Sequence, residues 1–219
     1  MVGNDEACPT GDQLLDVVVE ILETDGYDAV ALRAVARRAK SSLTTIYKRY
    51  PTRDDLILAA VMYWTERHRY AAIMPPEQDA GLPLHQRLMA LLRAIFEPWE
   101  RHPQMLAAYF RVRSSPNGQE LFRFGFDFVA PAGLQVLADV DDEFVANLDS
   151  IVSSLIYGLL GRFSAGEIAV TDILPTLDRA VYWLTRGYES RGSDRSPRIP
   201  PNSAPRSLAD ANRRIAEIN

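Results

Sequence analysis

Residues 32–57 of this 219-residue chain read LRAVARRAKSSLTTIYKRYPTRDDLI. The apolar positions at the start of the segment recur at helical spacing: Leu32, Val35, Ala36 and Ala39. This pattern predicts a short helix over 32–39, followed by a turn over 40–42. A second short helix is predicted over 43–49, with Ile46 facing inward, and Pro51 ends it. The segment therefore predicts two short helices joined by a tight turn.

Helical signals continue on both sides of this segment. The apolar positions between 14 and 22 predict a helix with Thr10 as its N-cap and Gly26 as its C-cap. Thr52 is the predicted N-cap of a helix over 53–72, and Asp55 completes a capping box. Further helices are predicted over 83–102, 103–114, 118–138, 141–165 and 171–190. No segment shows the alternation typical of a strand, so the predicted fold class is all-α.

The charges of the chain are distributed unevenly. The net charge is −5, which is not expected of a protein that binds nucleic acid over its whole surface. Between Asp28 and Asp54, however, there is no acidic residue. That interval contains seven cations: Arg33, Arg37, Arg38, Lys40, Lys48, Arg49 and Arg53. Such a block is either a solvated helix face or a local site for an anionic partner.

Two short helices joined by a tight turn are typical of the helix-turn-helix, whose second helix enters the major groove of DNA. The outward positions of the predicted helix 43–49 bear two short hydroxyls, a tyrosine and two cations. We assign Thr44 and Thr45 to base contacts and the cations and Tyr47 mainly to phosphates. The predicted DNA-binding residues are Arg33, Ser42, Thr44, Thr45, Tyr47, Lys48, Arg49 and Arg53.

With the preceding GYDAVAL at 26–32, the segment 32–57 resembles the DNA-binding domain of TetR-family repressors. The motif covers about 60 residues, and the remainder resembles the family in length and helical architecture. This chain departs from the family pattern at three positions. Lys40 stands where glycine is usual in the turn, Leu43 where a basic or polar residue is usual, and Ala31 where a threonine or serine caps the helix. These departures bear on which operator sequence is bound.

The resemblance implies an N-terminal three-helix helix-turn-helix DNA-binding domain over 10–55, connected through the helix 53–72. It further implies a C-terminal helical ligand-binding and dimerisation domain over 73–190, followed by an irregular extension over 191–219. The implied protein is a cytoplasmic homodimer that represses transcription from a palindromic DNA operator. A hydrophobic small-molecule effector would release it.

Apolar and aromatic side chains in the C-terminal half predict either a plain core or an apolar effector pocket. The predicted ligand-binding residues are Met62, Trp64, Met105, Tyr109, Phe110, Phe122, Phe126 and Leu155. Small residues within the last two long helices predict close helix packing, because glycine inside a helix is costly. The resemblance implies that this packing forms a dimer interface, with an intrachain core as the alternative. The predicted interface residues are Leu155, Gly158, Leu159, Leu177, Val181 and Leu184.

Other classes of function have little support in the sequence. Cys8 is the single cysteine, and the three histidines lack an acidic pair at metal-ligand spacing, so no metal site is expected. No phosphate loop or nucleophile motif is present, so neither an enzyme nor a cofactor is expected. The chain contains no run of 18 apolar residues, so no membrane span is expected. The remaining alternative is a helical small-molecule-binding or interaction protein that no longer binds DNA specifically.

Overall fold

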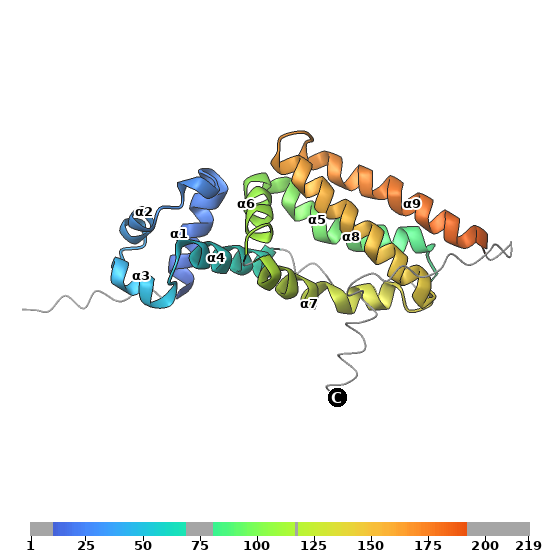
Figure 1. The fold of residues 1–219 in the computed structure, drawn as a ribbon, viewed down its shortest axis with the longest axis horizontal. Coiled ribbons are helices and arrows are strands. Elements are labelled where there is room, and N and C mark those ends of the chain that lie inside the picture. The colour runs from blue at the N-terminus through green and yellow to red at the C-terminus, as the bar shows by residue number, and fades with distance from the viewer. Residues whose placement is uncertain (1–10, 69–80, 117, 192–219) are drawn as a thin grey trace, which may run out of the picture. The chain divides into compact units, whose positions relative to one another are not determined.

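The structure is a computed structural model that describes residues 11–68, 81–116 and 118–191. Every regular element within these residues is a helix, so the predicted all-α fold is confirmed (Figure 1). The residues pack as two units. The N-terminal unit contains the described residues of 11–68 and 98–125, and the C-terminal unit contains those of 81–97 and 126–191. The predicted Thr10 cap, the helix end at 69–72 and the extension from 192 lie outside the described residues.

The N-terminal unit is built from short helices around one apolar core. Its complete elements are α1 (Gly11–Thr24), η1 (Tyr27–Ala29), α2 (Leu32–Arg38), α3 (Leu43–Arg49), α4 (Arg53–His68) and α6 (Pro103–Arg113). Val18, Leu22, Val35 and Ile46 are fully buried in its core. The inward direction predicted for Ile46 is therefore confirmed. Ile46 is the buried residue of α3 and holds that helix against α2, while Leu43 is partly buried and the other residues of α3 are exposed.

Local signals explain where these helices begin and end. The Thr52 amide donates to Oδ2 of Asp55 at 3.0 Å, and the Asp55 amide donates to Oγ1 of Thr52 at 3.1 Å, which confirms the predicted capping box. Gly26 has φ +82°, and its amide donates to the Ile21 carbonyl at 3.0 Å, so it ends α1 as predicted. Ala31 precedes α2 without any side-chain cap.

The packing places one segment differently from the predicted domain division. Residues 98–125 belong to the N-terminal unit, because α6 packs against α1 and α4. Trp99 lies with its ring centroid 4.6 Å from that of Trp64. The boundary predicted near residue 72 follows the order of the chain, whereas the contacts bring a later segment back to the first helices. Two helices, α5 (Leu84–Arg101) and α7 (Gly118–Val136), contribute residues to both units.

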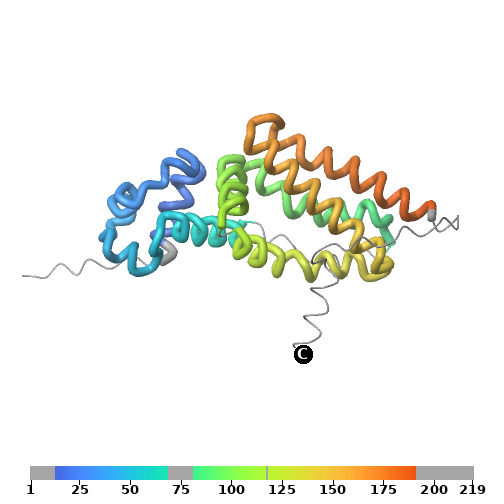
Figure 2. Tube along the Cα trace, viewed as in Figure 1, coloured from blue at the N-terminus to red at the C-terminus, as the bar shows by residue number. Residues whose placement is uncertain are grey.

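The C-terminal unit is dominated by two long helices. These are α8 (Asp142–Ser164) and α9 (Ile173–Arg191), joined through η3 (Val170–Asp172). They pack against each other along their lengths, as the tube in Figure 2 shows. Asp141 caps α8, because its Oδ1 accepts a hydrogen bond from the Phe144 amide at 2.9 Å. The bounds of α5 to α9 agree with the predicted ranges to within two residues.

Candidate nucleic-acid interface

The candidate interface begins with the turn between α2 and α3. The Ser41 amide donates to the Ala36 carbonyl at 2.9 Å, and the Lys40 amide donates to the Arg37 carbonyl at 3.3 Å. Lys40 has φ +49°, which is the left-handed conformation that glycine adopts with least strain. The turn therefore keeps the geometry of a tight helix-turn-helix although its residue is a lysine.

Ser42 fixes the first turn of α3. Its Oγ accepts a hydrogen bond from the Thr45 amide at 3.0 Å and lies 2.8 Å from the Thr45 Oγ1. Ser42 is thus the N-cap, and the Thr45 hydroxyl is already paired within the helix. Thr44 is exposed beside them. Of the two threonines predicted to contact bases, Thr44 has the hydroxyl without a hydrogen bond among the described residues.

The remaining outward side chains of α3 are exposed. Tyr47 is 51% exposed, and Lys48 and Arg49 are exposed beside it. On α2, Arg33 and Arg37 are also exposed. Within the part of the chain that the structure describes, no ion pair engages any of these four cations. Because their charges are not neutralised by a described carboxylate, they suit an external anion.

Two other cations of the basic block have partners inside the protein. Arg38 lies 3.7 Å from Asp25. The sequence predicts that Arg53 contacts phosphates, but its Nε donates to the Val30 carbonyl at 2.6 Å and its Nη2 donates to the Tyr27 carbonyl at 2.5 Å. Hydrogen bonds to two backbone carbonyls hold the Arg53 guanidinium against η1. Arg53 therefore positions the start of α4, a role that sequence reasoning missed.

Tyr27 connects η1 to two arginines from later helices. The guanidinium carbons of Arg53 and Arg111 lie 4.8 Å and 4.2 Å from the centroid of its ring. Burial raises the pKa of the Tyr27 hydroxyl, and the Asp54 carboxylate raises it further. Arg111 Nη1 also donates to Oδ2 of Asp28 at 2.7 Å, and this hydrogen bond lowers the pKa of Asp28. No local sequence signal links Arg111 to Asp28, because 83 positions separate them.

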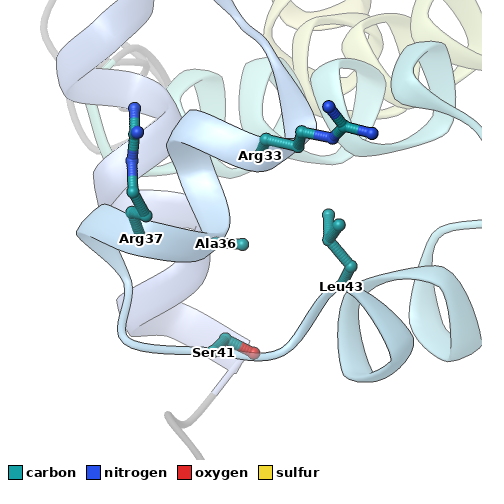
Figure 3. A pocket seen from close by; sticks show the side chains of 5 residues that line it. All are labelled: Arg33, Ala36, Arg37, Ser41 and Leu43. Atoms are coloured by element: carbon teal, nitrogen blue, oxygen red, sulfur yellow. The ribbon is translucent and has the colours of Figure 1, made fainter.

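The helix-turn-helix also borders an open hollow. It is lined by Arg33, Ala36, Arg37, Ser41 and Leu43 (Figure 3). Ala36 points into the space between α2 and α3, and Leu43 lies on its α3 side. The hollow is thus lined by two apolar side chains, two arginines and Ser41.

Two family models match this chain in the regions just described. Residues 14–60 match the family described as "Bacterial regulatory proteins, tetR family". Residues 81–184 match the family described as "Tetracyclin repressor-like, C-terminal domain". The chain belongs to the TetR family.

Individual relatives agree with this family. The HTH-type transcriptional repressor KstR of Mycolicibacterium smegmatis is 27% identical over 195 residues, which cover 85% of this chain and 89% of that protein. KstR of Rhodococcus jostii is 30% identical over 100 residues, 46% of this chain and 45% of the relative. In that match and in the match to the Mycobacterium tuberculosis regulator Rv1556, the chain spans less than half of the relative's length (45% and 32%).

Solved structures show the same fold. The crystal structure of a TetR transcriptional regulator from Rhodococcus sp. RHA1 superimposes with a TM-score of 0.61 at 19% identity. The alignment covers 80% of this chain and 97% of that one. A TetR-like regulator from the same source aligns with a TM-score of 0.53 at 20% identity, covering 81% of this chain and 94% of that one.

In this TetR-family chain, the predicted ligand-binding residues divide between the two units. Six lie in the N-terminal unit: Met62, Trp64, Met105, Tyr109, Phe110 and Phe122. Phe126 and Leu155 lie in the C-terminal unit. Trp64 and Met105 have no exposed surface, so they form core of the N-terminal unit instead of lining open space. A pocket that includes the other residues stays a prediction.

The predicted dimer-interface residues fall into two groups, one buried within the chain and one exposed at least in part. Three of them are at most 4% exposed within the single chain: Leu159, Leu177 and Val181. They are buried because α8 and α9 pack against each other. They are intrachain core and have almost no area left for a partner. Gly158 is exposed, and Leu155 and Leu184 are partly exposed, so these three stay available for an interface.

Proposed function

We propose that this TetR-family protein is a cytoplasmic transcriptional repressor, not an enzyme, that binds a palindromic DNA operator as a homodimer. One observation carries the proposal. In a chain of net charge −5, four exposed cations on α2 and α3 lack a described carboxylate partner: Arg33, Arg37, Lys48 and Arg49. They lie on the two helices of a helix-turn-helix, whose second helix enters the major groove. Relatives named as transcriptional repressors support the repressing mode.

Dimerisation supports operator binding through symmetry. A two-fold dimer places two recognition helices at half-sites about 34–36 Å apart or at a multiple of that turn. Helix α8 is long and apolar enough to cross a membrane by length and composition, because it contains an 18-residue window with a mean hydropathy of 1.4. Yet only 17% of that window is buried within the chain. A second copy that covers the α8 and α9 face would remove this apolar surface from water.

Helices α8 and α9 carry exposed large apolar side chains of the kinds found at interface cores. These side chains are Ile151, Tyr157, Tyr182 and Trp183, which are 39–72% exposed. Aromatic residues are enriched at the centres of protein interfaces. We propose that the α8 and α9 face, together with Gly158, replaces the three buried residues of the predicted dimer interface.

The effector is proposed to be a hydrophobic small molecule that binds the region of the C-terminal family match. It would bind more tightly to the dimer conformation in which the two recognition helices do not match the spacing of the half-sites. Binding would therefore shift the dimer population towards the conformation that does not bind DNA. Thermal denaturation against a panel of lipophilic ligands tests this step. A ligand that raises the melting temperature is expected to weaken DNA binding, and a ligand that raises it without weakening DNA binding would contradict the release mechanism.

Affinity for DNA tests the main proposal. Sequences are first enriched from a random pool by the full-length protein, and Kd is then measured by fluorescence anisotropy at two salt concentrations. We expect sequence-specific binding that weakens steeply with salt. The logarithm of the binding constant should fall with the logarithm of the salt concentration, with a slope of about −0.9 for each phosphate contacted. The variant Lys48→Ala with Arg49→Ala is expected to weaken binding and flatten the slope.

The control variant is Arg93→Ala with Arg101→Ala, which removes the same charge from exposed positions outside α2 and α3. It is expected to bind DNA like the wild type. Weak binding to all sequences, unchanged by the Lys48 and Arg49 substitutions, would contradict the proposal. That outcome would instead favour a helical ligand-binding or interaction protein that no longer reads DNA.

A further inference from the structure

Leu43 lies at the N-terminal end of α3, the second helix of the helix-turn-helix. It is the first residue of the helix, directly after the Ser42 cap. The N-terminal residues of a recognition helix are the ones that contact base edges in the major groove. A leucine side chain can neither donate nor accept a hydrogen bond, so its part in base reading is apolar contact.

The major groove offers one apolar group of its own. Thymine presents its C5-methyl there, whereas the other bases present hydrogen-bonding groups at their edges. An apolar recess at the start of a recognition helix therefore discriminates for thymine. Here the recess has two apolar walls from different helices, Leu43 on α3 and Ala36 on α2 (Figure 3).

Leu43 is less buried than the core residue of the same helix. Ile46 supplies the buried contact of α3 with 0% exposure, while Leu43 is only partly buried. Ala36, which lines the hollow, is buried and has 8% of its surface exposed. Leu43 therefore retains apolar surface that the packing of the unit does not use.

The rim of the hollow is positively charged. Arg33 and Arg37 line it and have no ion pair among the described residues. Guanidinium groups bind phosphates on either side of a base step and so fix the register of the helix on the duplex. An apolar surface with two such cations among its lining residues suits a base methyl group next to backbone phosphates.

We propose that Leu43 and Ala36 form a receptor for the C5-methyl group of a thymine in each operator half-site, with Arg33 and Arg37 binding the adjacent phosphates. The inference rests on the proposed DNA-binding function and adds a base to it. Leu43 is then a specificity-determining residue, and its difference from the basic or polar residue usual in the family makes the half-site of this protein distinct.

Removal of single methyl groups from the operator DNA tests the proposal. Each thymine of the enriched operator is replaced in turn by deoxyuridine, which removes only the methyl group. In the wild-type protein, one position per half-site is expected to lose affinity by about fourfold, the effect of one buried methyl group. In Leu43→Ala, the same replacement is expected to change Kd by less than twofold.

Two further variants sharpen the assignment. In Thr44→Ala, which changes the neighbouring exposed residue, the uracil effect is expected to persist. In Leu43→Lys, the preferred base at the position is expected to change from thymine towards guanine, because lysine donates to guanine O6 and N7. Far-ultraviolet circular dichroism and thermal denaturation establish that each variant is folded.

The outcomes distinguish this inference from the proposed function. Specific operator binding with no thymine whose methyl effect depends on Leu43 would overturn the inference and leave the repressor proposal intact. A methyl effect that Thr44→Ala abolishes and Leu43→Ala preserves would overturn it in favour of Thr44. Absence of any sequence-specific DNA binding would overturn both.

Discussion

Lys40 shows how a single residue stores strain in the turn of the helix-turn-helix. Its φ of +49° lies in the left-handed region, where a side chain with a Cβ costs about 1–2 kcal/mol and glycine costs little. The turn keeps its geometry because Ser41 and Lys40 donate backbone hydrogen bonds back to α2. The strain is thus accommodated by the surrounding hydrogen bonds.

Replacing this residue should relieve the strain. We expect Lys40→Gly to raise the free energy of unfolding by about 0.5–1 kcal/mol, less than the full strain because glycine also gains freedom in the unfolded chain. Urea denaturation at fixed protein concentration measures the change. The control Arg37→Gly, within α2, is expected to lower stability by about 1 kcal/mol. Changes in the free energy of unfolding with the same sign in both variants would contradict this account.

Glu23 is a second residue whose contacts matter more than its sequence suggests. Its Oε1 accepts a hydrogen bond from Trp64 Nε1 at 2.8 Å and lies 2.8 Å from His102 Nδ1. Trp64 has no exposed surface, so its indole N–H depends on this partner. His68 stacks on the same indole at 4.8 Å between ring centroids.

Removing the carboxylate leaves a buried donor without its acceptor. We expect Glu23→Ala to lower the free energy of unfolding by about 1–3 kcal/mol, the cost of an unsatisfied buried polar group. Glu20→Ala on the same helix is the matched control, because the Glu20 side chain is exposed, and it is expected to change stability by less than about 0.5 kcal/mol. Similar losses in both variants, measured by urea denaturation, would contradict the assigned role.

At the scale of elements, helix ends were well predicted because their signals are local. The reciprocal Thr52–Asp55 cap and the Gly26 C-cap lie within a few residues of the helix ends that they determine. The role of η1 was not predictable, because it depends on Arg53 and Arg111 from helices far along the chain. Their guanidinium groups meet at Tyr27 only after α4 and α6 have packed.

The Arg111–Asp28 contact between α6 and η1 should show a defined pH dependence. The hydrogen bond from Arg111 lowers the folded-state pKa of Asp28 below its usual value of 3.8. The stabilisation is therefore complete above about pH 3.8 and is lost as the pH falls through the folded-state pKa. We expect the stability difference between wild type and Asp28→Asn to shrink on acidification over this range.

Urea denaturation at a series of pH values measures that difference. In an Arg111→Ala background, the effect of Asp28→Asn is expected to depend much less on pH, because the hydrogen bond that contributes most to lowering the Asp28 pKa is gone. A stability difference that stays constant with pH in the wild-type background would contradict the contact.

At the scale of the whole molecule, the proposed dimer depends on the α8 and α9 face. Trp183 is 72% exposed, more than any other large hydrophobic side chain that the structure describes. We expect Trp183→Glu to convert the dimer to a monomer and to weaken operator binding at least tenfold, because one half-site alone is then engaged. Sedimentation equilibrium measures the first effect and fluorescence anisotropy the second.

Leu82→Glu provides the matched control for this prediction. Leu82 is also an exposed large apolar residue, at 43%, but lies outside α8 and α9. It is expected to stay dimeric with unchanged DNA affinity. A dimeric Trp183→Glu protein, or dissociation in both variants, would contradict the proposed interface.

The amino-acid sequence by itself determined the all-α class, the positions of the helices and the helix-turn-helix, because helical periodicity, caps and charge runs are local properties of the chain. Only the tertiary structure decided which residues of these helices remain available. It buried Leu177 and Val181 in the chain's own core, turned Arg53 towards two carbonyls and left Leu43 beside Ala36 at an open hollow. The physical reason is that exposure and pairing depend on neighbours brought together by packing, and periodicity within one helix does not specify those neighbours.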